Sequence, residues 1–142
     1  MADGAARGNP GPAAYGFVLH APDGQIVAEE GVALGRATNN VAEYEGLLAG
    51  LQRALTLGVR RLRVRLDSEL VVRQMNGVYR VKNAGLRPLF ERAQEFQRQF
   101  EAVTFEHIRR EVNRRADELA NQALDEKGGG RIGSQTGDRG RP

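Results

Sequence analysis

The residues of this sequence best suited to chemistry are four carboxylates, Asp3, Glu43, Asp67 and Asp117. Each stands at the start or end of a predicted element, where its side chain could reach a common point. A single acidic residue in such a place is ordinary, because Asp and Glu cap helices and favour their amino ends. Four converging carboxylates would repel one another, and a hard divalent cation with oxygen ligands is the natural compensation. The pattern therefore predicts a magnesium site.

The elements that must position these acids alternate between strands and helices. Apolar alternation over residues 15–19 and 26–34, around a Pro22-Asp23-Gly24 turn, predicts an antiparallel hairpin. Helical spacing predicts helices over residues 40–57, 68–75, 86–100 and 113–125. Further strands are predicted over residues 62–66 and 103–108, and Asp3 lies on the first strand. The order β-β-β-α-β-α-α-β-α indicates an α/β fold, with helices on the faces of a mixed sheet.

The composition limits the kinds of site that the chain can carry. It has no cysteine, which excludes disulfides, thiolate-bound zinc and a cysteine nucleophile. With 142 residues, 40% of them hydrophobic, it has the size of one compact domain. No apolar run approaches the roughly 20 residues that span a bilayer, and the first residues do not resemble a signal peptide. A cytoplasmic monomer without membrane contact is the default expectation.

Most of the net positive charge comes from the end of the chain. Of 21 basic and 18 acidic residues, residues 128–142 hold three arginines and one aspartate, which leaves 18 basic and 17 acidic residues in 1–127. The pI of about 9.8 is thus weak support for nucleic-acid binding. The last stretch is rich in glycine and has one large apolar residue. We expect a folded domain over residues 1–127 and a flexible tail over 128–142.

Four stretches of the sequence resemble the signature blocks of type 1 ribonuclease H. They are DGAARGNPGPAAYG from Asp3, TNNVAEYEGLLAGL from Thr38, LDSELVVRQMNG from Leu66 and NRRADELANQAL from Asn113. The blocks follow the family's order and spacing and cover nearly all of the predicted domain. The resemblance implies a five-stranded mixed sheet flanked by helices. It also implies a metal-dependent endonuclease that hydrolyses the RNA strand of RNA–DNA hybrids and leaves 5′-phosphate ends.

The resemblance also assigns residues to roles. The catalytic and metal-binding acids would be Asp3, Glu43, Asp67 and Asp117, around two Mg²⁺ ions for which Mn²⁺ could substitute. Contacts to the RNA strand would fall on Gly4, Asn9, Asn39 and Asn40, and a DNA phosphate would bind near Arg36 and Thr38. Two metal ions can activate water and stabilise the leaving oxygen. Asparagine amides both donate and accept, as the 2′-hydroxyl of RNA does.

Two parts of the family pattern differ in this chain. The connection before Asp117 is short, so His107 is expected within the last strand as a structural residue, and Arg110 is the candidate for the catalytic role of the family's loop histidine. The basic helix-loop of some members has no counterpart, because residues 82–86 pass directly to the next helix. Substrate affinity is therefore expected to be modest and salt-dependent.

Plainer interpretations stay open for these residues. Glu43 could pair with Asn40 as a helix cap, and Asp67 could cap the helix that follows it. Asp117 could simply favour the helix dipole, and the asparagines near residue 40 could mark a helix entry.

The first strand leaves a functional alternative open. Only Met1 and Ala2 precede Asp3, so this strand is expected to be short. The alternative function is a module that binds RNA–DNA hybrids without cutting them.

Overall fold

The computed structural model describes residues 1–128. Its elements are β1 (Ala2–Ala6), β2 (Gly11–His20), β3 (Ile26–Ala37), α1 (Asn39–Thr56), β4 (Arg61–Leu66), α2 (Glu69–Met75), α3 (Arg87–Gln97), β5 (Ala102–His107) and α4 (Arg114–Gly128). This order is the predicted one. The flexible tail predicted for residues 128–142 lies outside the described residues, apart from Gly128 at the end of α4.

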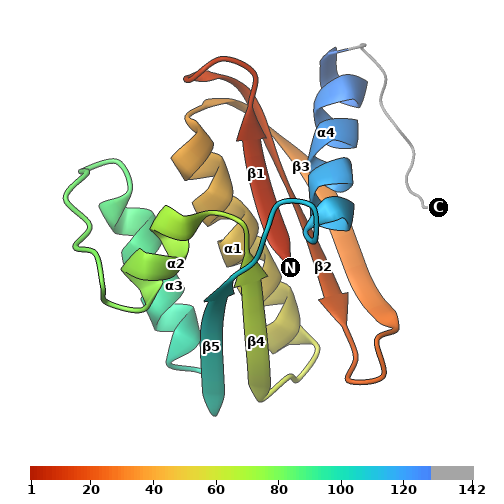
Figure 1. Cartoon of the computed structure of the whole chain (residues 1–142), viewed down its shortest axis with the longest axis vertical. Coiled ribbons are helices and arrows are strands. Elements are labelled where there is room, and N and C mark those ends of the chain that lie inside the picture. The colour runs from red at the N-terminus through yellow and green to blue at the C-terminus, as the bar shows by residue number, and fades with distance from the viewer. Residues whose placement is uncertain (129–142) are drawn as a thin grey trace.

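The five strands form one mixed sheet in the order β3-β2-β1-β4-β5 (Figure 1). Strands β1, β2 and β3 form an antiparallel meander. Strand β4 then pairs in parallel with β1, and β5 pairs in parallel with β4. The first strand is therefore the centre of the sheet, although only five residues long. The predicted α/β fold with a mixed sheet is confirmed.

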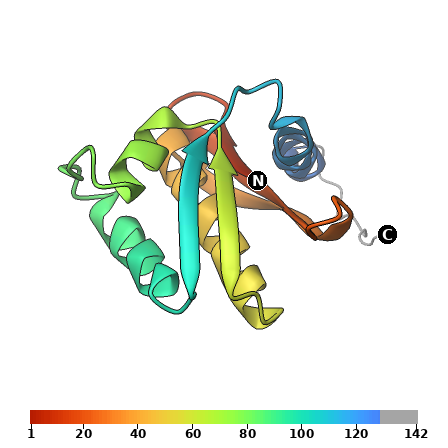
Figure 2. The same cartoon turned by 60° about the horizontal axis from the view of Figure 1, so that its bottom comes forward.

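Helices cover both faces of this sheet, with α1, α2 and α3 on one side and α4 on the other (Figures 1 and 2). Alternate residues of β2 point to opposite faces, as in any strand. Tyr15 and Phe17 join the large core cluster that contains the buried side of α1. Ala14 and Val18, which point to the opposite face, pack against α4. The central strands are thus buried from both sides, which holds any residue on them firmly.

Helix α1 lies against β1 with no side chain between the two backbones. A Cβ atom on Gly4 would lie 2.2 Å from the carbonyl carbon of Ala42 and 2.3 Å from the amide nitrogen of Glu43. Only glycine permits such an approach. The packing therefore brings Glu43 directly beside the strand that carries Asp3.

The predicted element boundaries differ from the observed ones by a few residues at several ends, among them the hairpin and α3. The hairpin strands are longer than their apolar alternation, because β2 pairs with β3 from Gly11↔Ala37 onward. The predicted helix over residues 86–100 ends earlier, at Gln97, because the chain must turn to enter β5. Among residues 1–128, no helix is both long and apolar enough to cross a bilayer.

Candidate metal centre

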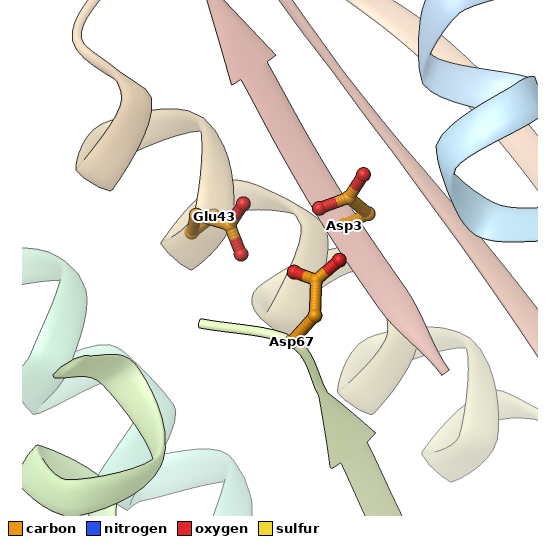
Figure 3. Close-up of side chains that lie close together, drawn as sticks. All are labelled: Asp3, Glu43 and Asp67. Atoms are coloured by element: carbon orange, nitrogen blue, oxygen red, sulfur yellow. The ribbon is translucent and has the colours of Figure 1, made fainter. Parts of the chain in front are cut away.

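Three of the four predicted acids converge at one end of the central strands (Figure 3). Asp3, Glu43 and Asp67 each offer a carboxylate oxygen, and these oxygens lie within 4.8 Å of one another. The sheet register explains two of the three. Ala2 pairs with Leu66 in parallel strands, so the next residue of each chain segment, Asp3 and Asp67, reaches the same level. The approach of α1 at Gly4 supplies Glu43.

Two of these residues are buried and Asp67 is half-buried, and the three carboxylates are only partly satisfied. Asp3 is 2% exposed and Glu43 is 8% exposed. Glu43 Oε1 accepts a hydrogen bond of 3.1 Å from the Gly4 amide. Within the described residues, Asp3 Oδ2, Glu43 Oε2 and Asp67 Oδ2 are buried without a hydrogen-bond partner. Such orphaned oxygens are costly, and a hard cation is the ligand that satisfies them. The donor set fits magnesium or manganese.

The same crowding appears in the proton affinities of the acids. Burial raises the pKa of Asp3 to about 10, and the charge of Glu43 and the nearby carboxyls of Asp117 and Asp67 add to the rise. Burial also raises the pKa of Glu43 to about 7; Asp67 adds to this rise, while the Asp3 carboxyl, the Gly4 amide and Arg110 oppose it. Without a compensating cation, the cluster therefore retains protons near neutral pH.

Asp117 lies at the edge of this cluster. It stands in the first turn of α4, on the face of the sheet opposite α1, and is half-buried. Its carboxyl is one of the groups that raise the pKa of Asp3. Its oxygens are not part of the group within 4.8 Å. The distance of Asp117 from the other acids thus depends on how α4 packs against the sheet.

The capping interpretations of two acids are wrong. Helix α1 is capped by Thr38, whose Oγ1 accepts from the Val41 amide at 3.2 Å, so Glu43 is not part of a cap with Asn40. Helix α2 is capped by Ser68, whose Oγ accepts from the Val71 amide at 3.3 Å, and Asp67 precedes that cap. Both acids are therefore available for another role. Asp117 does lie where the helix dipole favours an acid.

The asparagines predicted to contact RNA lie in two segments that hydrogen-bond each other. The Asn39 amide donates to Asn9 Oδ1 at 3.0 Å, and the Ala6 amide donates to Asn39 Oδ1 at 2.8 Å. These bonds join the β1–β2 loop to the start of α1, and Asn9, Asn39 and Asn40 are exposed there. The helix-entry interpretation of Asn39 is also correct, since α1 begins at this residue.

The other predicted contacts have mixed positions. Arg36 is exposed near the end of β3, two residues before the half-buried Thr38. Gly4 is buried beneath α1, so its lack of a side chain is already required by packing.

The two candidates for the missing loop histidine differ in their relation to the acids. His107 ends β5 opposite Leu66, as expected within the strand, but it is exposed and does not pack in the core. Arg110 is exposed in the loop before α4, and its charge lowers the pKa of Glu43. Arg110 therefore lies close enough to influence the cluster.

One buried polar residue near the acids escaped the sequence analysis. Asn113 is 0% exposed and precedes α4. Its position four residues before Asp117, at the start of the last signature block, was the available signal.

Comparison with known proteins agrees with this geometry. A protein family described as "Reverse transcriptase-like" matches residues 1–123. The "Bifunctional protein Rv2228c" of Mycobacterium tuberculosis is 50% identical over 125 residues, 87% of this chain and 34% of that protein. "Ribonuclease HI" of Halobacterium salinarum is 48% identical over 124 residues, 87% of this chain and 62% of that protein. The chain thus spans about a third of the mycobacterial relative and less than two thirds of the archaeal one.

Solved structures give the same relationship at the level of the fold. RNase H1 from Halobacterium salinarum superposes with a TM-score of 0.86 at 48% identity, covering 88% of this chain and 95% of that one. The N-terminal RNase H domain of rv2228c superposes with a TM-score of 0.88 at 48% identity, covering 91% and 94%. LC11-RNase H1, solved in complex with an RNA/DNA hybrid, has a TM-score of 0.85 at 43% identity, covering 89% and 95%. This chain belongs to the type 1 ribonuclease H family.

Proposed function

We propose that this protein is an endonuclease that hydrolyses the RNA strand of RNA–DNA hybrids with two bound Mg²⁺ ions, or Mn²⁺ in their place. The observation that carries the proposal is the group of three carboxylates that each have a buried oxygen without a hydrogen-bond partner. A relative with 43% identity, LC11-RNase H1, has been solved in complex with an RNA/DNA hybrid, which supports the same class of substrate.

The four acids would bind the metal from different elements of the fold. Asp3 comes from the central strand of the sheet and would hold the metal from this rigid element. Glu43 and Asp67 flank it, and Asp117 approaches from α4. When bound, the ions would activate the attacking water and stabilise the leaving 3′-oxygen. The acids themselves bind and orient, and their burial excludes competing water.

Recognition of the hybrid would fall to the exposed groups beside the acids. Asn9, Asn39 and Asn40 would contact the RNA strand and sense its 2′-hydroxyl groups. The hydrogen bond from the Asn39 backbone amide to Asn9 Oδ1 fixes the two segments relative to each other, which lowers the entropy lost on binding. Arg36 and Thr38 would hold a phosphate of the DNA strand, since a guanidinium group suits phosphate geometry. The cut should depend on the shape of the duplex rather than on base identity.

Arg110 would take the place of the loop histidine that other family members use. Its charge lowers the pKa of Glu43, and it is exposed in the loop before α4. A guanidinium group cannot serve as a proton acceptor at neutral pH. Its contribution would therefore be to attract the product phosphate away from the acids. This role predicts a slower release of product in Arg110→Ala and normal binding of metal.

The direct test is cleavage of an end-labelled RNA–DNA hybrid, with single-stranded RNA and double-stranded DNA of the same sequence as controls. The hybrid should yield RNA fragments with 5′-phosphate ends when Mg²⁺ is present, and no fragments with EDTA. A shift of the hybrid on a gel without any cleavage, in both Mg²⁺ and Mn²⁺, would support the non-catalytic binding module instead. If the protein neither cleaved nor bound the hybrid, both functions would be refuted.

A further inference from the structure

One buried polar atom near the metal centre is not explained by the proposed ligand set. In the part of the chain that the structure describes, four buried side-chain oxygens lack a hydrogen-bond partner. Three belong to Asp3, Glu43 and Asp67, and the fourth is Oδ1 of Asn113. Asn113 itself is 0% exposed. A fully buried amide with one unsatisfied end destabilises a protein, so its presence calls for a physical reason.

The other end of this amide makes a short bond to the central strand. Asn113 Nδ2 donates to the carbonyl oxygen of Ala2 at 2.7 Å, across 111 positions of sequence. That carbonyl belongs to the peptide group that joins Ala2 to Asp3. The bond is therefore attached to the backbone immediately before the acid at the centre of the site.

The backbone of Asn113 is hydrogen-bonded to the loop that precedes it and to the first turn of α4 that follows it. Its amide donates to the carbonyls of Arg109 and Arg110 at 3.3 and 3.0 Å, which closes the loop before α4. Its own carbonyl accepts from the Asp117 amide at 3.2 Å. One residue thus connects the strand that carries Asp3, the loop that carries Arg110 and the helical turn that carries Asp117.

We propose that Asn113 is a positioning residue, which holds the first turn of α4 against β1 so that Asp117 stands beside Asp3 and completes the metal-binding set. The two acids repel when both are ionised, and α4 reaches the sheet on the face opposite α1 (Figure 2). The Asn113 bond opposes that repulsion at the point where it acts. This inference rests on the proposed function, because it concerns the same metal centre.

The structure offers a matched control for a purely structural role. Asn76 Nδ2 donates to the carbonyl of Phe105 at 3.1 Å, which ties the end of α2 to β5. It is the same kind of bond, from an asparagine side-chain amide to a strand carbonyl, but it is made to β5 and not to the strand that carries Asp3. Asn76→Ala should lower the melting temperature and leave metal binding as it is.

The experiment is calorimetric titration of the full chain with Mn²⁺, without substrate, at a temperature where every variant is folded. Asn113→Ala should raise the Mn²⁺ dissociation constant by about 10- to 100-fold, the usual effect of losing a group that orients metal ligands. Asn113→Asp keeps the shape, replaces the donor with an acceptor oxygen and adds a negative charge. It should also weaken Mn²⁺ binding, although its added negative charge would by itself attract the cation.

The outcomes separate this inference from the proposed function. If the wild-type protein neither binds Mn²⁺ nor cleaves the hybrid, the proposed function fails. If the wild-type protein does both and Asn113→Asp binds Mn²⁺ as tightly or more tightly, only the positioning role is refuted. Equal weakening by Asn76→Ala would also refute it, because the loss would then follow general destabilisation. Should Asn113→Ala not fold, the isosteric Asn113→Asp variant decides the matter.

Discussion

At the scale of the residue, Asp67 has opposite effects on activity and on stability. Its charge raises the pKa of both Asp3 and Glu43, so the three acids repel in the metal-free protein. Asp67→Asn should raise the free energy of unfolding of the metal-free protein by something of the order of 1 kcal/mol, the size of a one-unit pKa effect. The same variant should lose cleavage by at least about 100-fold, since it loses a metal ligand.

The measurement is the melting temperature in EDTA, together with the initial rate of hybrid cleavage in Mg²⁺. Glu91→Gln is the control, because Glu91 is an exposed acid on α3. It should change neither quantity. A clear fall in the metal-free melting temperature of Asp67→Asn would mean that the carboxylates do not crowd one another.

Two glycines of the same core should respond to alanine with opposite signs. Gly4→Ala would place its Cβ 2.2–2.4 Å from the backbone of α1, so β1 and the helix must separate. We expect a loss of about 1–3 kcal/mol or more, with a parallel loss of metal binding because Glu43 moves. Gly50→Ala, inside α1, would bring its Cβ to 3.7 Å from Phe17 on β2, an ordinary van der Waals distance. It should stabilise by up to about 1 kcal/mol. Denaturant unfolding of both variants tests the contrast.

At the scale of the element, the start of α1 links stability to substrate binding. Thr38 caps this helix through the Val41 amide, and the following residue holds Asn9. Thr38→Ala should cost about 1 kcal/mol of stability and raise KM for the hybrid, because the first turn loosens where the RNA would bind. Thr38→Ser keeps the hydroxyl and should restore both. Thr56→Ala, at the exposed end of the same helix, should leave KM unchanged.

Local patterns predict most of these elements, because alternation and helical spacing are properties of neighbouring residues. The order of strands and helices, and the places of Glu43 and Asp67 near element ends, follow from such patterns. The caps do not follow from such patterns. Thr38 and Asn40 at the start of α1, and Asp67 and Ser68 before α2, are all acceptable cap residues, and only the backbone geometry distinguishes them. The long hairpin strands likewise depend on pairing that extends past the apolar residues.

At the scale of the whole molecule, the site is assembled by contacts that no local pattern encodes. The pairing of Ala2 with Leu66 aligns Asp3 with Asp67, and the packing at Gly4 adds Glu43. Family resemblance predicts that these acids meet, but not that Asp117 stands outside the closest group or that Asn113 ties its helix to β1. Both facts depend on which face of the sheet receives α4, a property of the complete fold.

The whole cluster should also couple folding to pH and to metal. Burial raises the pKa of Glu43 to about 7 and that of Asp3 to about 10, so these two acids bind more protons in the folded protein than in the unfolded chain above about pH 4. Their contribution to stability therefore falls as pH rises through this range. Burial also lowers the pKa of the Met1 amino group to about 6, and the contribution of this group rises between about pH 6 and pH 8, which offsets part of the fall. Between about pH 5.5 and pH 8, the metal-free protein should lose of the order of 1–3 kcal/mol. Saturating Mg²⁺ should remove most of that loss, because it binds the ionised carboxylates.

Chemical denaturation at several pH values, in EDTA and in Mg²⁺, measures this coupling. Asp67→Asn provides the internal control, since a cluster with one fewer charge should show a shallower fall in EDTA and a smaller gain from Mg²⁺. An equal pH dependence of the wild type and Asp67→Asn in EDTA would mean that the acids are not held close together in the folded chain. An equal pH dependence with and without Mg²⁺ would mean that the acids do not bind the ion, and the proposed metal centre would then be wrong.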